Sequence, residues 1–289
     1  MSLEPILIES RQPTESRQPI VVRQMDFDFP SDIDPVVVTG DPEQSYLMIG
    51  LSLLLPYLEP YLIRTMKEAK KQIDDPGLID DLERFSAQEG QHYRQHMRFN
   101  DSIRRQGFPG LEPLEKKLAA DYKGFSSNRS LRFNLAYAEG FEALTTASAR
   151  FSFERESDDE VLPSVSALFE WHLVEELEHR TVAFDVYEHV CGGYVYRLVA
   201  GLYAQWHMSS FIRRVGKYML EADPEAVERC GGKEGLRERR RKVGPDIRRL
   251  LLPKLLKTYS PRYTPHDIPF EAELQEMSTR YSELARSTR

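Results

Sequence analysis

Two short motifs in this sequence place a carboxylate and an imidazole one helical turn apart. They are Glu89-x-x-His92 and Glu176-x-x-His179, and each interrupts the middle of an otherwise apolar helical stripe. Buried groups of this kind are costly unless they are paired or bound to a cation. Two such motifs, each preceded by a helix with a lone inward glutamate, are the pattern of a four-helix di-metal carboxylate site.

Each of the two remaining helices offers a candidate for the lone inward glutamate. Glu142 lies near the centre of the apolar face of its helix. Glu139 lies about 60° to the side of that face by helical geometry, so it is an alternative ligand or a residue that holds a ligand in place. Glu59 is at the edge of its stripe, and we expect the bend caused by Pro60 to turn it inward.

Further polar residues near the motifs have more than one interpretation. His172 precedes Glu176 by four residues, so it is either a third imidazole ligand or an imidazole hydrogen-bonded to a ligand carboxylate. We expect His96 and Asp185 to support ligands rather than to bind metal. A buried salt-bridge network is the competing explanation for all these groups, and it would need arginine or lysine on the inward stripes, which carry none.

Long helices must position these residues. Capping and breaking residues predict that the ligand helices occupy about 43–191, as four helices at about 43–73, 77–106, 128–154 and 162–191. The extra helices are predicted to occupy about 194–286, as three helices near 194–221, 233–258 and 270–286. No period-2 alternation is longer than a few residues, so we expect an all-α bundle.

Residues 1–40 contain a nearly repeated proline-containing hexapeptide and are predicted to be an extended arm, with local pairing through 20–22. Residues 41–289 would form the helical di-metal domain.

Composition limits the other possibilities. The chain has 289 residues, a formal charge of −7 and a pI near 5.6, which is typical of a globular protein and argues against nucleic acid as a partner. Cys191 and Cys230 are too few for a disulfide framework, so we expect a reducing, cytoplasmic setting.

No targeting signal is visible. The apolar stretches 46–58 and 190–212 are too short or too polar to predict a transmembrane segment. The long helices and the arm are compatible with a homodimer.

With these residues identified, the chain resembles a bacterial family of predicted metal-dependent hydrolases with a ferritin-like helical core. The resemblance covers about 45–270. It rests on Gln88-Glu89-Gly90-Gln91-His92 with His96 and Asn100, on Glu142-Ala143-Leu144-Thr145, and on segments 171–179, 182–187 and 259–267. It implies a ferritin-like four-helix bundle with additional C-terminal helices. Ala143 departs from the histidine expected in the family.

The arrangement of His172, Glu176 and His179 is also similar to the site of the di-iron arylamine N-oxygenases, which implies no particular substrate. That similarity implies seven metal ligands, namely Glu59, Glu89, His92, Glu142, His172, Glu176 and His179.

Carboxylate and imidazole ligands suit iron, manganese or zinc. From the ligand set we expect two metal ions, with iron first, and an oxidase or oxygenase that uses O₂ and an electron donor on a small, partly apolar substrate. The aromatic residues expected to line its pocket are Phe85, Phe99, Phe141, Phe169 and Trp171. The alternatives are a hydrolase that uses a metal-activated water, and a non-catalytic metal-binding bundle.

Overall fold

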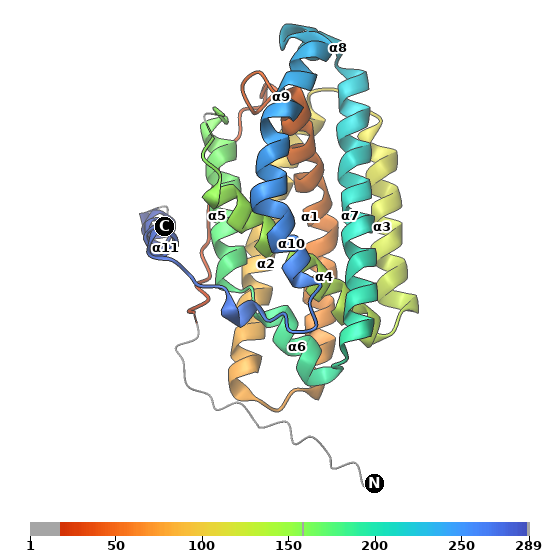
Figure 1. The fold of residues 1–289 in the computed structure, drawn as a ribbon, viewed down its shortest axis with the longest axis vertical. Helices are drawn as coiled ribbons and strands as arrows, with labels where there is room; N and C mark the ends of the chain where they lie inside the picture. Colours follow the sequence, from red (N-terminus) through yellow and green to blue (C-terminus); the bar gives the residue numbers. More distant parts are fainter. Residues whose placement is uncertain (1–17, 158, 288–289) are drawn as a thin grey trace.

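Long helices make up most of the chain, as the apolar periodicity predicts (Figure 1). The computed structural model describes residues 18–157 and 159–287. Within these ranges no β-strand forms, and an isolated bridge between Val38 and Val161 is the one β-type pairing. The prediction of an all-α fold is therefore confirmed.

Four helices surround the centre of the molecule: α1 (Pro42–Ala69), α2 (Pro76–Arg104), α4 (Leu131–Glu154) and α5 (Pro163–Glu178). The long helix α7 (Tyr194–Ala222) packs against α1 and α4. The remaining elements are η1 (Lys70–Gln72), α3 (Leu111–Asn128), α6 (Val182–Val190), α8 (Pro224–Arg229), α9 (Gly232–Asp246), the π-helical turn η2 (Ile247–Leu251), α10 (Leu252–Thr258), η3 (Pro265–Asp267) and α11 (Ala272–Ser287).

Side-chain caps mark the starts of three of the four central helices, α1, α2 and α4. Asp41 accepts a hydrogen bond from the Gln44 amide (3.0 Å), and Pro42 occupies the first turn of α1, as predicted. Asp75 caps α2 in the same way, and Ser130 caps α4. Such caps satisfy amides at the helix start that have no partner within the helix. Helices α1 and α2 begin within one residue of their predicted starts, whereas α4 begins at Leu131 rather than at the predicted residue 128.

The structure corrects several predicted boundaries. Helix α3 was not predicted, although its buried residues recur at helical spacing. Helix α8 is also additional, and the predicted helix over 233–258 is divided into α9, η2 and α10. The predicted helix over 162–191 is interrupted at 179–181. At this break the Arg180 guanidinium donates hydrogen bonds to the carbonyls of Leu177 and Ile268, which satisfies a carbonyl left free where α5 ends.

The described part of the arm, residues 18–40, lies extended along α2 and α5 (Figure 1). Between residues 22 and 30 the side chains alternate between exposed and buried, and the buried ones there are Arg23, Met25, Phe27 and Phe29. The predicted local pairing through 20–22 is wrong. The arm is instead held by helix side chains, because the Gln95 amide group donates to the Met25 carbonyl (2.6 Å) and accepts from the Phe27 amide (3.2 Å).

Helix α1 and η1 together form a long apolar stretch. By length and composition alone, the 31 residues Pro42–Gln72 could cross a membrane. However, 67% of the most hydrophobic run of 18 residues in this stretch is buried within the molecule. Because its side chains pack against α2, α4 and α7, this stretch serves as a central helix of the bundle.

Candidate metal centre

The fold brings all seven predicted ligands to one place at the centre of the bundle. Helix α1 contributes Glu59, α2 contributes Glu89 and His92, α4 contributes Glu142, and the last turns of α5 contribute the others, with His179 at the residue that ends this helix. The exposed fraction of each is 5% or less. Helix α1 continues through Pro60 and buries Glu59 completely.

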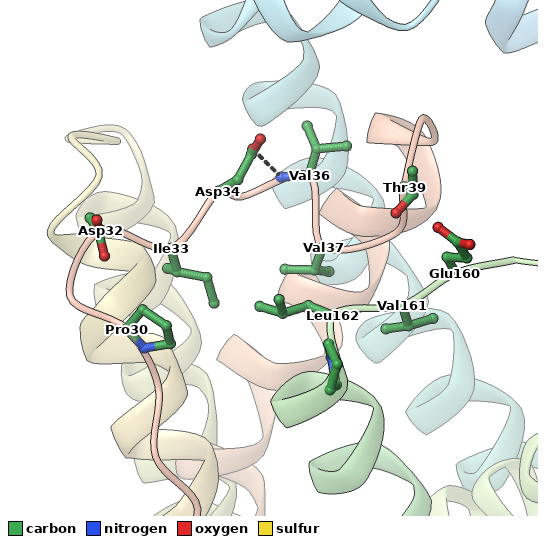
Figure 2. Close-up of a pocket in the computed structure, with 11 residues that line it drawn as sticks. Pro30, Asp32, Ile33, Asp34, Val36, Val37, Thr39, Glu160, Val161 and Leu162 are labelled. Carbon is green, nitrogen blue, oxygen red and sulfur yellow. Dashed lines mark hydrogen bonds between the residues drawn. The ribbon is translucent and has the colours of Figure 1, made fainter.

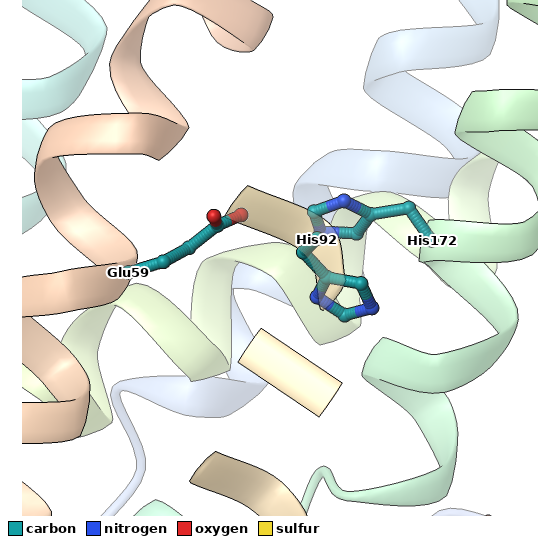
Figure 3. A group of neighbouring side chains, drawn as sticks. All are labelled: Glu59, His92 and His172. Atoms are coloured by element: carbon teal, nitrogen blue, oxygen red, sulfur yellow. The ribbon is translucent and has the colours of Figure 1, made fainter. Parts of the chain in front are cut away.

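Potential ligand atoms converge in three groups, within each of which the atoms lie within 4.8 Å of one another. Figure 3 shows Glu59 on α1 directed toward His92 and His172. The other two groups are Glu89 with His92 and Glu176, and Glu89 with Glu142 and His179. Together the three groups contain every predicted ligand.

The distances show which carboxylates lie between the imidazoles. His179 Nε2 is 3.5 Å from Glu89 Oε1, 3.5 Å from Glu142 Oε2 and 3.6 Å from Glu176 Oε2. His92 Nδ1 is 4.0 Å from Glu89 Oε1 and 3.8 Å from Glu176 Oε1. Glu89 and Glu176 therefore each face both imidazoles.

Unpaired polar atoms provide the test of whether these residues fit metal ions. Among the described residues, both carboxylate oxygens of Glu59, Glu89 and Glu142 are buried without a hydrogen-bond partner. The same is true of one oxygen of Glu176, of His92 Nδ1 and of His179 Nε2. Buried polar atoms are nearly always satisfied in proteins, and so many at one point need a common partner. Divalent cations fit, because these donors are oxygen and nitrogen atoms that suit iron, manganese or zinc.

Electrostatics in the metal-free protein leads to the same requirement. Burial and the neighbouring carboxylates raise the pKa of Glu59 and Glu89 well above the usual value, and burial with the nearby Glu176 raises the pKa of Glu142 to about 7. Burial alone would raise the pKa of Glu176, but His179 and His172 hold it well below the usual value. Several carboxylates cannot ionise together here without added positive charge.

A chain of hydrogen bonds sets the protonation pattern of His172. Asn100 Nδ2 donates to the Ser52 carbonyl (2.8 Å), so Asn100 Oδ1 accepts from the Ser52 hydroxyl (2.7 Å). Ser52 Oγ then accepts from His96 Nδ1 (2.8 Å), and His96 Nε2 accepts from His172 Nδ1 (2.8 Å). His172 Nδ1 thus donates to His96, and its other ring nitrogen, Nε2, lies 2.9 Å from Glu176 Oε1. The chain of hydrogen bonds therefore fixes which edge of the His172 ring faces the candidate ligands.

The predicted supporting residues have different environments. His96 touches His172, as the chain above shows, whereas Glu139 lies outside the three groups and binds the buried guanidinium of Arg197 (2.7 Å). Asp185 is hydrogen-bonded to His266 Nε2 (2.7 Å).

The inward stripes of the ligand helices carry no arginine or lysine, but Arg23 of the arm and Arg197 of α7 reach buried glutamates from outside these stripes. Their partners are Glu175, Glu178 and Glu139 rather than the seven predicted ligands.

Three buried residues beside the ligands were not predicted as site residues: Gln88, Glu175 and Glu178. Gln88 contacts His179, Glu175 contacts His92, and Glu178 is linked to His179 through Gln88. The signal for the two glutamates was present in the dense run 171–179, where they accompany Glu176. The arm and α11 cover the face of α5 that points away from the bundle, so α5 is buried on that face as well. The sequence of α5 alone does not indicate this second buried face.

The aromatic residues predicted to line a pocket are buried, and three of them pack against imidazoles. Phe85 lies against His179 with ring centroids 4.7 Å apart, and Trp171 lies against His92 at 4.9 Å. Phe169 lies against His96 at 5.4 Å. A surface pocket of about 630 Å³ lies away from these residues, between the arm and segment 160–163 (Figure 2).

Fold and site together define an all-α protein with a buried carboxylate and imidazole cluster suited to metal ions. The sequence pattern of the family described as predicted metal-dependent hydrolases matches residues 21–268, and the protein belongs to that family. The match begins within the arm, so the expectation that the arm lies outside the resemblance is wrong from residue 21 onward. No curated protein and no solved structure matches the chain.

Proposed function

We propose that this protein is a metal-dependent hydrolase that acts at a dinuclear centre held by Glu59, Glu89, His92, Glu142, His172, Glu176 and His179. The observation that carries the proposal is the convergence of buried, unpaired carboxylate and imidazole atoms at one point. The description of the family supports hydrolysis over the oxidative chemistry expected from the ligand set.

The three groups of atoms suggest how the residues divide between two ions. Glu142 and His179 would hold one ion, and Glu59, His92 and His172 would hold the other. Glu89 and Glu176 would contact both, since each faces both His92 and His179. Four carboxylates would balance the charge of two divalent cations, which accounts for their burial without lysine or arginine partners.

Bound divalent cations would polarise the bond to be cleaved and lower the pKa of a water molecule. The chain itself would keep the imidazoles oriented through His96 and the other hydrogen-bonded partners, and Phe85 and Trp171 would shield two of the imidazoles from bulk water. We propose a small, partly apolar substrate, in keeping with these aromatic neighbours.

A di-iron oxidase or oxygenase is the second candidate. Two Glu-x-x-His motifs and a lone glutamate from each of two further helices form the ligand pattern of helical di-iron and di-manganese carboxylate proteins. This candidate would need O₂ and an electron donor, whereas the hydrolase would need neither.

Metal-specific activity separates the two candidates. The protein is stripped of metal, loaded with zinc, manganese or iron without O₂, and offered a panel of p-nitrophenyl esters and phosphate esters. The hydrolase predicts turnover with zinc or manganese, lost in Glu89→Ala. Oxygen consumption confined to the iron-loaded, reduced protein, with no ester turnover under any metal, would favour the oxidase and overturn the hydrolase.

A further inference from the structure

The N-terminal arm places one buried arginine beside the candidate centre. Arg23 is 2% exposed and is the only arginine that the described part of the arm buries. Its guanidinium donates to Glu175 Oε1 (2.9 Å), to Glu178 Oε1 (2.6 Å) and to Glu178 Oε2 (3.0 Å). Both glutamates lie on the last turns of α5, next to Glu176 but on the face that meets the arm.

One connection leads from Arg23 to the imidazole of the first Glu-x-x-His motif. Glu175 uses Oε1 to accept from Arg23 and from Trp171 Nε1 (2.8 Å), and its Oε2 lies 3.0 Å from His92 Nε2. Because Glu175 holds the Nε2 edge of the His92 ring, the other edge is turned toward the centre. His92 Nδ1, which has no hydrogen-bond partner, therefore lies on the side of Glu89 and Glu176.

A second connection leads to the imidazole of the other motif. Gln88 Nε2 donates to Glu178 Oε2 (2.9 Å), which turns the amide oxygen of Gln88 toward His179 Nδ1 (2.9 Å). His179 therefore donates from Nδ1 and presents Nε2 to Glu89, Glu142 and Glu176.

We propose that Arg23 is a positioning residue for the metal centre, which orients His92 through Glu175 and His179 through Glu178 and Gln88. Only a planar, forked cation can hold both carboxylates in these positions at once. The same guanidinium donates to Ser278 Oγ (2.7 Å) and Ser282 Oγ (2.9 Å) on α11, so the arm, α5 and α11 meet at this residue. The inference rests on the proposed dinuclear centre.

The test compares Arg23→Gln and Arg23→Lys with Arg197→Gln, which breaks another buried arginine–glutamate pair that does not lead to a ligand imidazole. Zinc and manganese affinities are measured by competition with a chelator on folded, monodisperse protein. We expect Arg23→Gln to bind metal roughly 10- to 100-fold more weakly. Arg23→Lys, which keeps the charge but loses the fork, should fall between it and the wild type. Arg197→Gln should bind as the wild type does.

The ring nitrogen that keeps its proton in the folded, zinc-loaded protein is a readout that a loss of stability alone would not change. Nitrogen-15 NMR of labelled histidines at saturating zinc should show the wild-type His92 proton on Nε2 and the His179 proton on Nδ1, and both assignments should become mixed in the Arg23 variants. If Arg23→Gln does not fold, Arg23→Lys decides the question.

Wild-type affinity and unchanged protonation in the Arg23 variants would overturn the inference while leaving the centre intact. A wild-type chain that binds no metal would overturn the dinuclear centre itself, and the inference with it.

Discussion

Replacing Glu142 with glutamine should stabilise the metal-free protein and weaken metal binding at the same time. Burial and the nearby Glu176 raise the pKa of Glu142 from 4.5 to about 7 in the fold. Each pKa unit corresponds to about 1.4 kcal/mol, so ionising this group in the metal-free fold costs about 3 kcal/mol. Glutamine has a similar shape and never ionises, so it avoids that cost.

The gain in stability of the metal-free variant over the wild type grows with pH. Below about pH 4.5 the carboxyl group of Glu142 is protonated in both the folded and the unfolded chain, and glutamine should make little difference. As the pH rises toward 7 and above, the unfolded chain ionises freely and the fold does not, so the wild type loses stability progressively. At pH 8 the metal-free Glu142→Gln protein should be more stable by about 3 kcal/mol, or roughly 6 °C in melting temperature.

The assay is chemical and thermal unfolding of chelator-treated protein at pH 4 and pH 8. Glu283→Gln, on the exposed face of α11, is the matched control and should change stability by less than about 0.5 kcal/mol at either pH. Added zinc or manganese should reverse the order, because the wild type gains more binding energy than the variant. The reasoning fails if metal-free Glu142→Gln is no more stable than the wild type at pH 8, or if its advantage is as large at pH 4.

Two further outcomes follow from the same geometry. Glu89→Ala and His179→Ala should each abolish uptake of the metal pair, measured as metal per chain by elemental analysis, and stoichiometric metal in both variants would refute the ligand assignment. Arg197→Gln leaves Glu139 buried without its partner, so urea titration should show a loss of about 3–5 kcal/mol. Burial raises the pKa of Glu139 to about 7 even beside Arg197, so this loss should be greatest above pH 7; an equal loss at pH 4 would contradict the reasoning.

The sequence alone was sufficient for the helical class and for the residues that meet at the centre. The spacing of Glu89 to His92 and of Glu176 to His179 places each pair on one face of a helix whatever lies around it, because a helix repeats every 3.6 residues. Apolar neighbours on that face predict burial, and buried acids and imidazoles together predict a cation. All seven predicted ligand residues are therefore found in the three groups of converging atoms.

Only the tertiary structure decided which residues stand behind those ligands. Arg23 reaches Glu175 and Glu178 across more than 150 positions of the chain, and nothing in the local pattern of either segment specifies that contact. Helical periodicity determines which side chains share a face, whereas the element that covers that face depends on how the arm and α11 pack. Packing also interrupted the expected helix at His179, where Arg180 binds carbonyl groups from two segments.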